Sequence, residues 1–258
     1  MRARQLTVRQ FVRQYPIEMR GGHIVIRNGA QALLLNTGCP VSIGRRPSFE
    51  FLDREIPALQ RYQGMTVEQW SEVIGINIDA VLGSDVLGRY AVAIDPDAGG
   101  VVFDDDAAPP HARGARLDTV AGMPVVEVGL AGGRRRVLFH TGAMLSCLRD
   151  VDTRDHPCVG VARDSYPGLG EFATELRQVP LVFGDQRVSL ECGQLPAPLE
   201  RALRTTGIDG IVGTNLLRMF SVEWGSRFSE LRLAARATFT APVRLARFAE
   251  IHQIERAS

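Results

Sequence analysis

The sequence predicts an all-β protein built from two repeated lobes in one chain. An apolar strand followed by X-Thr-Gly, a small residue and Ser occurs at residues 32–42 and again at 136–146. A second shared segment, in which apolar residues precede a Gly, occurs at residues 78–87 and 208–217. The two loops lie 104 residues apart, a spacing that suits a duplicated lobe better than a solenoid repeat.

Each repeated loop follows a predicted β-hairpin. Residues 17–27 predict one strand, Asn28-Gly29 a turn, and residues 31–35 the returning strand. Asn-Gly between apolar runs strongly favours a tight hairpin. Residues 125–130 and 135–139 predict the equivalent hairpin in the second copy. Both loops are therefore expected at the ends of matching strands.

The two copies differ between the loop and the second shared segment, where the interval is 47 residues in the first copy and 73 in the second. In the first copy residues 65–74 predict a helix capped by Thr66. In the second copy residues 158–182 predict a β-hairpin with its tip near 166–170. We therefore expect an asymmetric molecule with one hairpin flap, supplied by the second lobe.

The predicted N-terminal lobe covers residues 1–106, a linker covers 107–116, and the C-terminal lobe covers 117–235. The linker follows from an acidic run and a Pro-Pro pair, which cannot continue a strand. Residues 236–258 have apolar positions three and four apart in their later part, which predicts an amphipathic helix packed on the body. The alternative is that this tail joins residues 5–19 in an inter-lobe sheet.

An X-Thr-Gly loop after an apolar strand, followed by an apolar-Gly segment, resembles the aspartic proteases of the pepsin and retropepsin type. The resemblance covers most of residues 16–105 and 118–233. It implies a bilobal, pepsin-like (retropepsin-like) acid-protease fold with a few short helices and a cleft between the lobes. In that family each half supplies Asp-Thr-Gly, but here the two Asp positions hold Asn36 and His140.

The two replaced positions decide which chemistry such a cleft can perform. Two carboxylates about 3 Å apart share one proton, so that one acts as a base while the other donates. Asn36 cannot take up a proton near neutral pH, whereas His140 can, with an ordinary pKa near ~6.5. The shared-proton mechanism is lost, and we do not expect a conventional aspartic protease.

The rest of the loop pattern is retained. The resemblance implies that Thr37 and Thr141 hydrogen-bond across the lobe interface, and Gly38 and Gly142 are expected to permit the tight loop backbone. The predicted ligand-binding residues are Thr37, Gly38, Thr141, Gly142, Tyr166 and Gly168.

Three functional interpretations follow. The first is an enzyme for a non-proteolytic reaction, with His140 as general acid or base and Asn36 as its polar partner. The second is an inactive pseudoprotease that binds a peptide or small molecule in the cleft. The third is a cysteine-type hydrolase using Cys39, His140 and Asn36. The enzyme and the binding interpretations both fail if His140 is buried without access to the cleft, and the loops would then only join the lobes.

Composition narrows the partners and the location. The net charge of +1 does not favour nucleic acid or an anionic membrane. The N-terminus has no apolar signal segment, and no apolar stretch approaches the ~18 residues needed to span a membrane. We expect a cytoplasmic protein of bacterial character with four reduced cysteines. Without a C-x-x-C pair no metal or cofactor is expected, and the fused lobes allow a monomer.

Several other residues are expected to be structural. Four histidines are isolated in sequence and are expected to be surface or hydrogen-bonded residues: His23, His111, His156 and His252. The matching positions of Asp79 and Asp209 indicate a structural role. Asp85 and Asn215 are expected to cap a short helix. The two tryptophans, Trp70 and Trp224, are expected in the core.

Overall fold

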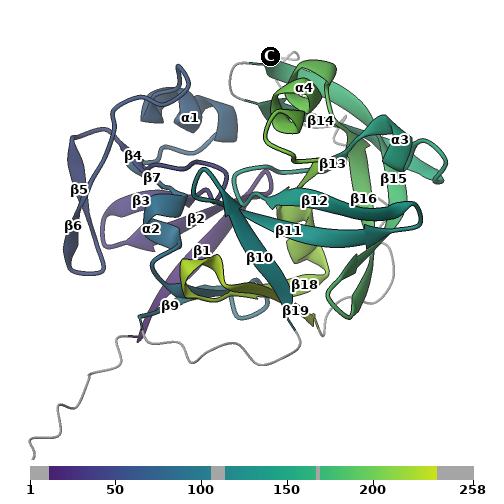
Figure 1. Ribbon diagram of the computed structural model, residues 1–258. Helices are drawn as coiled ribbons and strands as arrows, with labels where there is room; N and C mark the ends of the chain where they lie inside the picture. The colour runs from purple at the N-terminus through teal and green to yellow at the C-terminus, as the bar shows by residue number, and fades with distance from the viewer. Residues whose placement is uncertain (1–11, 106–113, 167–168, 237–258) are drawn as a thin grey trace, which may run out of the picture.

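The computed structural model describes residues 12–105, 114–166 and 169–236. Two β-rich lobes lie side by side, the first half of the chain forming one and the second half the other (Figure 1). The predicted all-β, bilobal architecture is confirmed. Most of the predicted linker, Gly168 at the flap tip and nearly all of the predicted tail lie outside the described residues.

The strands and helices follow one another in two comparable series. The first lobe contains β1 (Val12–Arg20), β2 (His23–Asn28), β3 (Gln31–Leu35), β4 (Ile43–Gly44), β5 (Ser48–Phe51), β6 (Arg54–Pro57), α1 (Val67–Ile74), β7 (Ala80–Leu82), α2 (Ser84–Leu87), β8 (Ala91–Asp95) and β9 (Gly100–Asp104). The second lobe contains β10 (Ala115–Val120), β11 (Met123–Leu130), β12 (Gly133–Phe139), β13 (Ser146–Leu148), α3 (Asp150–Thr153), β14 (Cys158–Tyr166), β15 (Gly170–Phe183), β16 (Gln186–Gln194), α4 (Ala197–Arg204), β17 (Gly210–Val212), the 3-10 helix η1 (Thr214–Arg218), β18 (Phe220–Trp224), the 3-10 helix η2 (Ser226–Phe228) and β19 (Glu230–Ala235).

The duplication seen in the sequence recurs in the strand pairing. β3 pairs antiparallel with β2 and parallel with β7, placing Leu34 opposite Val81. β12 pairs antiparallel with β11 and parallel with β17, placing Leu138 opposite Ile211. Each repeated loop therefore leaves the end of a central, buried strand of its lobe.

The first predicted strand is wrong in its bounds, because the chain turns between β1 and β2. Gly21 and Gly22 adopt φ values of 53° and 85°, a region that glycine reaches without strain. The tip of this hairpin reaches the other lobe, where the Thr214 hydroxyl donates to the Gly22 carbonyl. A Cβ on Gly22 would lie 2.5 Å from the Met144 side chain, so the second glycine is also needed for this close approach.

One sheet joins the lobes through six described strands in the order β1-β9-β8-β18-β19-β10. The contact between lobes is the β8–β18 pair, in which Val222 lies opposite Ile94. Beneath it, Trp224 is fully buried, packs edge-on against Phe139, and donates its indole N–H to the Leu87 carbonyl at 3.3 Å. The largest apolar core cluster contains residues from both lobes, so the lobes form one packed body.

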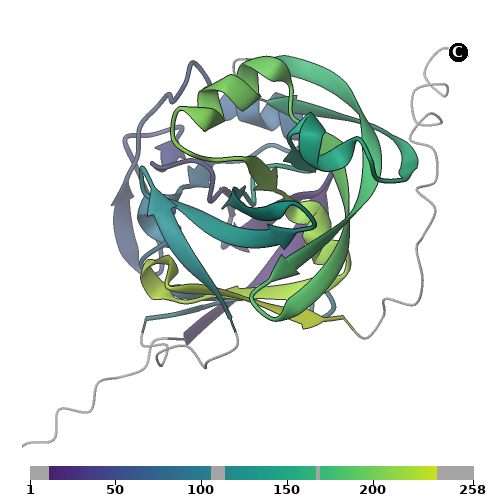
Figure 2. The same cartoon turned by 45° about the vertical axis from the view of Figure 1, so that its right-hand side comes forward.

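Different structures occupy the unequal intervals of the two lobes. In the first, the predicted helix is confirmed as α1, whose N-terminus is capped reciprocally by Thr66 and Gln69. In the second, β14 and β15 form a long hairpin in which Tyr166 lies opposite Gly170. Figure 1 places α1 and β14 at the same end of the molecule, and Figure 2 shows the long strands curving along the second lobe.

No helix in the described ranges combines the length and apolar character needed to cross a membrane.

Candidate functional site

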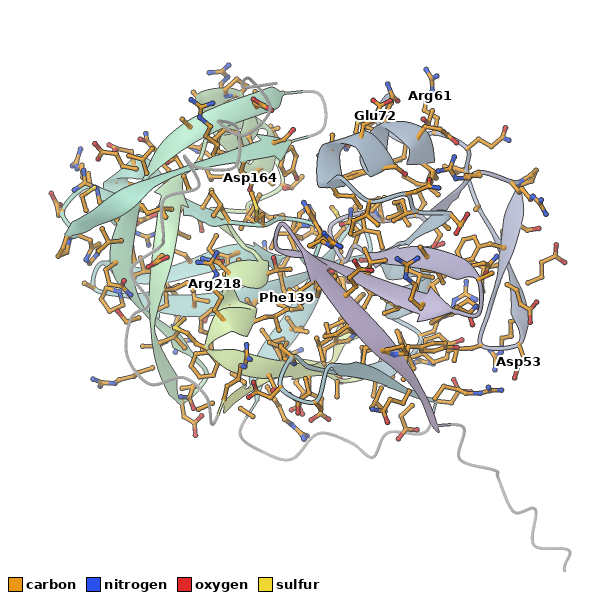
Figure 3. The ribbon with its side chains drawn as sticks, turned by 180° about the vertical axis from the view of Figure 1, so that it is seen from behind. Asp53, Arg61, Glu72, Phe139, Asp164 and Arg218 are labelled. Carbon is orange, nitrogen blue, oxygen red and sulfur yellow. The ribbon has the colours of Figure 1, made fainter. Side chains whose placement is uncertain are left out.

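The two repeated loops meet where the lobes join and are held there by a reciprocal pair of threonines. The Thr37 hydroxyl donates to the Phe139 carbonyl at 2.6 Å and accepts from the Thr141 backbone at 2.9 Å. The Thr141 hydroxyl donates to the Leu35 carbonyl at 3.0 Å and accepts from the Thr37 backbone at 3.0 Å. Phe139 lies at the centre of the molecule, between the lobes (Figure 3). Both threonines are buried, so they position the loops rather than line the pocket described below.

Asn36 and His140 are oriented by their own loops in the same way. The Gly38 N–H donates to Asn36 Oδ1 at 3.1 Å, and the Gly142 N–H donates to His140 Nδ1 at 3.0 Å. Because His140 Nδ1 accepts this bond, the neutral imidazole carries its proton on Nε2. The Asn36 amide nitrogen and His140 Nε2 form no hydrogen bond with other described residues.

Gly38 and Gly142 are required by the contact between loops rather than by a special backbone conformation. A Cβ on Gly38 would lie 2.2 Å from His140 Nε2, and one on Gly142 would lie 2.4 Å from Asn36 Oδ1. Each glycine thus faces the functional side chain of the opposite loop. These glycines were expected to permit a tight backbone, but the structure shows that they leave space for the side chain of the opposite loop.

Burial keeps His140 neutral. Its side chain is only 4% exposed, and burial, followed by the charge of nearby His23, lowers its pKa to about 4. Asn36 beside it is 1% exposed. The floor between the lobes therefore carries two neutral polar groups near pH 7, where two carboxylates would carry a shared negative charge.

His23 belongs to the same region, which corrects the expectation that it is a surface or fully hydrogen-bonded histidine. It is 7% exposed and hydrogen-bonds the Gly142 backbone, yet its Nδ1 has no partner among the described residues. Burial lowers its pKa to about 4. The Gly21-Gly22 turn carries His23 to the second lobe, and that glycine pair is the sequence signal that would have placed it.

A small pocket lies over the floor. It is lined by Asn36, Gly38, Cys39, Tyr62, Gln63, Trp70, His140 and Tyr166. Its volume of about 20 Å³ leaves room for a group the size of about one water molecule. The Tyr166 ring lies edge-on to His140, with centroids 6.0 Å apart and planes at 70°. His140 therefore has access to the pocket, although a narrow one, and Tyr166 lies beside it in the pocket lining.

Trp70 and Tyr62 are functional candidates that the sequence did not single out. Trp70 is 6% exposed and packs in the core as expected, but it also lines the pocket. Its indole N–H has no partner in the part of the chain that the structure describes. Tyr62 reaches the same pocket from the loop before α1, where its hydroxyl accepts from Gln63 at 3.4 Å.

Cys39 does not have the environment of an activated thiol. Its side chain is 3% exposed and donates to the Val41 carbonyl at 3.0 Å. Burial raises its pKa to about 12, so the thiolate is absent near neutral pH. No hydrogen bond between Cys39 and His140 exists in the described structure. The geometry therefore argues against the cysteine-hydrolase interpretation.

A serine in each repeated loop hydrogen-bonds the residue that was expected to cap a short helix, Asp85 in the first lobe and Asn215 in the second. This corrects the expected capping roles. Ser42 donates to Asp85 at 2.8 Å, and Ser146 donates to Asn215 at 2.6 Å. Each serine also accepts, at 3.0 Å, the N–H of the glycine in the second shared segment of its lobe. The cap position of α2 is instead Gly83, because the Asp85 carboxylate is engaged by the loop.

Asp79 and Asp209 have the structural role expected from their symmetry. Asp79 accepts the Ala32 N–H at 2.8 Å, and Asp209 accepts the Arg136 N–H at 3.1 Å. Each carboxylate thus holds the strand that leads to the repeated loop of its own lobe. Across the described ranges, no group of three or more His, Cys, Asp or Glu side chains is arranged to hold a metal ion.

Comparison with known proteins gives a likeness of fold. No known protein family and no curated protein matches the chain. Among 116 matching chains of solved structures is the aspartic proteinase from Irpex lacteus, 13% identical, with a TM-score of 0.47 and coverage of 90% of this chain and 99% of that chain. The pepsin-like fold assignment stands on the duplicated strand pairing, the inter-lobe sheet and the reciprocal threonines of this chain.

Proposed function

We propose that this chain is a non-proteolytic protein that binds a peptide or small molecule over the inter-lobe pocket of an aspartic-protease-like scaffold, with one small group of the ligand entering the pocket. One observation carries the proposal. The loops retain their threonine, glycine and serine contacts, while the two positions at the pocket floor hold the neutral hydrogen-bonding groups of Asn36 and His140.

This pair suits binding better than proton exchange. Efficient acid–base catalysis needs a group whose pKa lies near the working pH. The His140 pKa of about 4 leaves it almost entirely neutral at pH 7, and the Asn36 amide does not titrate. Around these polar groups, Trp70 and Tyr166 supply apolar walls.

A second candidate is an enzyme for a non-proteolytic reaction, with His140 as general acid or base and Asn36 as its polar partner. The observation that favours it is the bond from the Gly142 N–H to His140 Nδ1. This bond fixes the imidazole orientation and leaves the Nε2–H group as the donor through which His140 could act on a substrate. Binding of an anionic ligand would raise the His140 pKa toward a useful range.

The test combines ligand retention with turnover. Wild type, His140→Ala and the double variant Asn36→Asp/His140→Asp are incubated with peptide libraries and metabolite extract from about pH 4 to about pH 9. Equilibrium dialysis and mass spectrometry then report retained and converted molecules. His156→Gln is the matched control, because the His156 side chain lies outside the pocket lining.

We expect wild type to retain a ligand unchanged and the double-Asp variant to cleave peptides at acidic pH. A product made by wild type and lost in His140→Ala would establish the second candidate instead. If wild type neither retains nor converts anything, while circular dichroism shows it folded, the pocket has no ligand role and the loops only join the lobes.

A further inference from the structure

The buried part of the pocket offers hydrogen-bond donors whose own acceptors are already used. Asn36 Oδ1 accepts the Gly38 N–H and His140 Nδ1 accepts the Gly142 N–H, at 3.1 and 3.0 Å. What remains on these side chains is the Asn36 NH₂ group and His140 Nε2–H, both donors. The third buried polar group in the lining is the Trp70 indole, which is a donor only.

Trp70 provides an independent sign that an acceptor is missing. Its side chain is 94% buried, and its N–H is unpartnered in the described structure although almost all buried polar groups in proteins are paired. Leaving a buried donor unpaired costs roughly 1–3 kcal/mol. The other tryptophan, Trp224, shows the usual outcome, because its indole donates to the Leu87 carbonyl.

No remaining lining residue accepts a hydrogen bond from the Trp70 N–H in the described structure. Gln63 lies exposed at the rim and donates to the Tyr62 hydroxyl. The Cys39 thiol is used by the Val41 carbonyl, and the Tyr166 hydroxyl can serve as either donor or acceptor. The lining residues include no Asp, Glu, Arg or Lys, so the pocket is neutral apart from what His140 can take up.

We propose that a carboxylate, of a small acid or of a peptide C-terminus, places one oxygen in the pocket and is held there by the N–H groups of Asn36, His140 and Trp70. This inference rests on the proposed binding function and names its ligand class. The remaining polar groups of these three lining side chains are all donors. An ionised carboxylate oxygen accepts shorter and stronger hydrogen bonds than the oxygen of a ketone or amide, so the set suits a carboxylate better.

Charge balance gives the proposal a measurable signature. A carboxylate brings a negative charge into a buried site without a cation, so binding should take up a proton. The charge of His23 on β2 acts on His140, and the titratable groups that line the pocket with it are Cys39 and Tyr62 from the first lobe and Tyr166 from β14. Asp164 on β14 acts on Tyr166, and burial raises its pKa to about 6. His23 and His140 are the members of this set that are neutral bases. Carboxylate binding should therefore tighten as pH falls, whereas binding of a neutral carbonyl should not.

The test follows the two indole N–H resonances in ¹H–¹⁵N NMR spectra of the full chain. The probes are sodium acetate, acetamide as its neutral counterpart, and one short peptide with a free or an amidated C-terminus. Sodium chloride controls for ionic strength. The Trp70 resonance is assigned by Trp70→Phe, and the Trp224 resonance is an internal control because its N–H is engaged in the core.

We expect acetate or the free peptide to shift the Trp70 resonance and leave Trp224 unmoved. The Kd should fall up to tenfold for each pH unit between about pH 7 and about pH 6. Trp70→Phe should weaken binding about tenfold or more, equivalent to loss of one charge-assisted hydrogen bond. Binding of the free peptide without acetate would identify a peptide C-terminus as the source, and acetate alone a small acid.

Other outcomes overturn the inference at separate levels. If acetamide binds as well as acetate with no pH dependence, the ligand class is wrong while the binding function stands. If neither carboxylate binds but the dialysis screen retains another molecule, the same conclusion holds. If chloride moves the resonance as acetate does, the effect is ionic and the inference fails. If no probe and no screened molecule binds, the inference and the proposed function fail together.

Discussion

The two lobes share the contacts that join them and differ in the groups that face the pocket. Thr37 and Thr141 occupy equivalent positions, and each satisfies backbone groups of the other lobe. Asn36 and His140 also occupy equivalent positions, but they carry different side chains. A residue that completes its partner's hydrogen bonds is constrained in both copies, whereas a residue that faces a pocket can change in one copy alone.

The covering elements differ in the same way. Tyr62 and Trp70 approach the pocket from the loop and helix of the first lobe, and Tyr166 approaches from the hairpin of the second (Figure 3 labels Glu72 on the helix and Asp164 on the hairpin). The turn before His23 has a counterpart at Ala121-Gly122, after which Met123 packs against the apolar cluster of its own lobe. Of these two hairpins, only the one in the first lobe brings a titratable side chain, His23, to the loop of the opposite lobe.

The strongest way to break the shared contacts is to remove either threonine hydroxyl. Thr37→Val and Thr141→Val each leave a buried carbonyl and a buried N–H without partners, at roughly 1–3 kcal/mol for each group. We expect each variant to lose about 4 kcal/mol of unfolding free energy, with similar values for both. Urea denaturation measures this loss, and a neutral effect in either variant would show that the lobes are joined in another way.

His23 and His140, which have no histidine at the equivalent position of the other lobe, should make the free energy of unfolding depend on pH. The His23 and His140 pKa values are lowered by burial to about 4, so the unfolded chain binds protons first as pH falls below ~6.5. Each histidine therefore contributes stability that is complete above ~6.5 and is lost toward pH ~4, up to about 3 kcal/mol. Burial raises the Asp164 pKa to about 6, which has the opposite sign and offsets part of the loss.

This prediction is checked by denaturation at about pH 7 and about pH 4.5. His140→Gln should reduce the pH-dependent loss by up to about 3 kcal/mol, because the variant has no imidazole to protonate at this position. His156→Gln serves as the control histidine outside the pocket lining. An unchanged pH dependence in His140→Gln would mean that this imidazole is not held neutral in the folded protein.

A smaller difference is expected between the supporting serines. Changing either serine to Ala leaves a buried glycine N–H without its acceptor, at about 1 kcal/mol or more. Ser42→Ala further leaves the Asp85 carboxylate without the hydroxyl and should cost about 3 kcal/mol in total, since bonds to charged groups are worth more. Ser146→Ala should cost about 2 kcal/mol in total, because Asn215 keeps its bond to the residue 146 backbone at 3.0 Å. Thermal denaturation of the pair measures the difference, and the reverse order would mean that the charge on Asp85 is balanced elsewhere.

The smallest effect is expected at Trp70 without ligand. Trp70→Phe removes a buried donor that has no described partner. The variant therefore no longer carries the free-energy cost of that unpaired N–H, and this offsets part of the packing energy lost with the larger ring. We expect its stability to stay within about 1 kcal/mol of wild type, whereas Trp224→Phe, which also breaks a bond to Leu87, should lose clearly more. Equal losses from calorimetry would indicate that the Trp70 N–H is satisfied in solution.

Much of the architecture follows from local patterns that the sequence displays directly. The repeated loops, the hairpins before them, the capped helix at α1 and the structural carboxylates Asp79 and Asp209 all depend on residues near one another or on visible symmetry. The replacement of two acidic positions by Asn36 and His140 is likewise visible without coordinates. These features determined the fold class and the centre of the candidate site.

Tertiary structure alone decided what surrounds that centre. His23 reaches His140 because the Gly21-Gly22 turn docks on the other lobe, and Trp70 faces the same pocket although its pattern indicates only a core helix. Asp85 bonds Ser42 rather than a helix end. Each of these outcomes depends on contacts between segments distant in sequence, where burial and competition for hydrogen bonds, rather than local propensity, determine which groups meet.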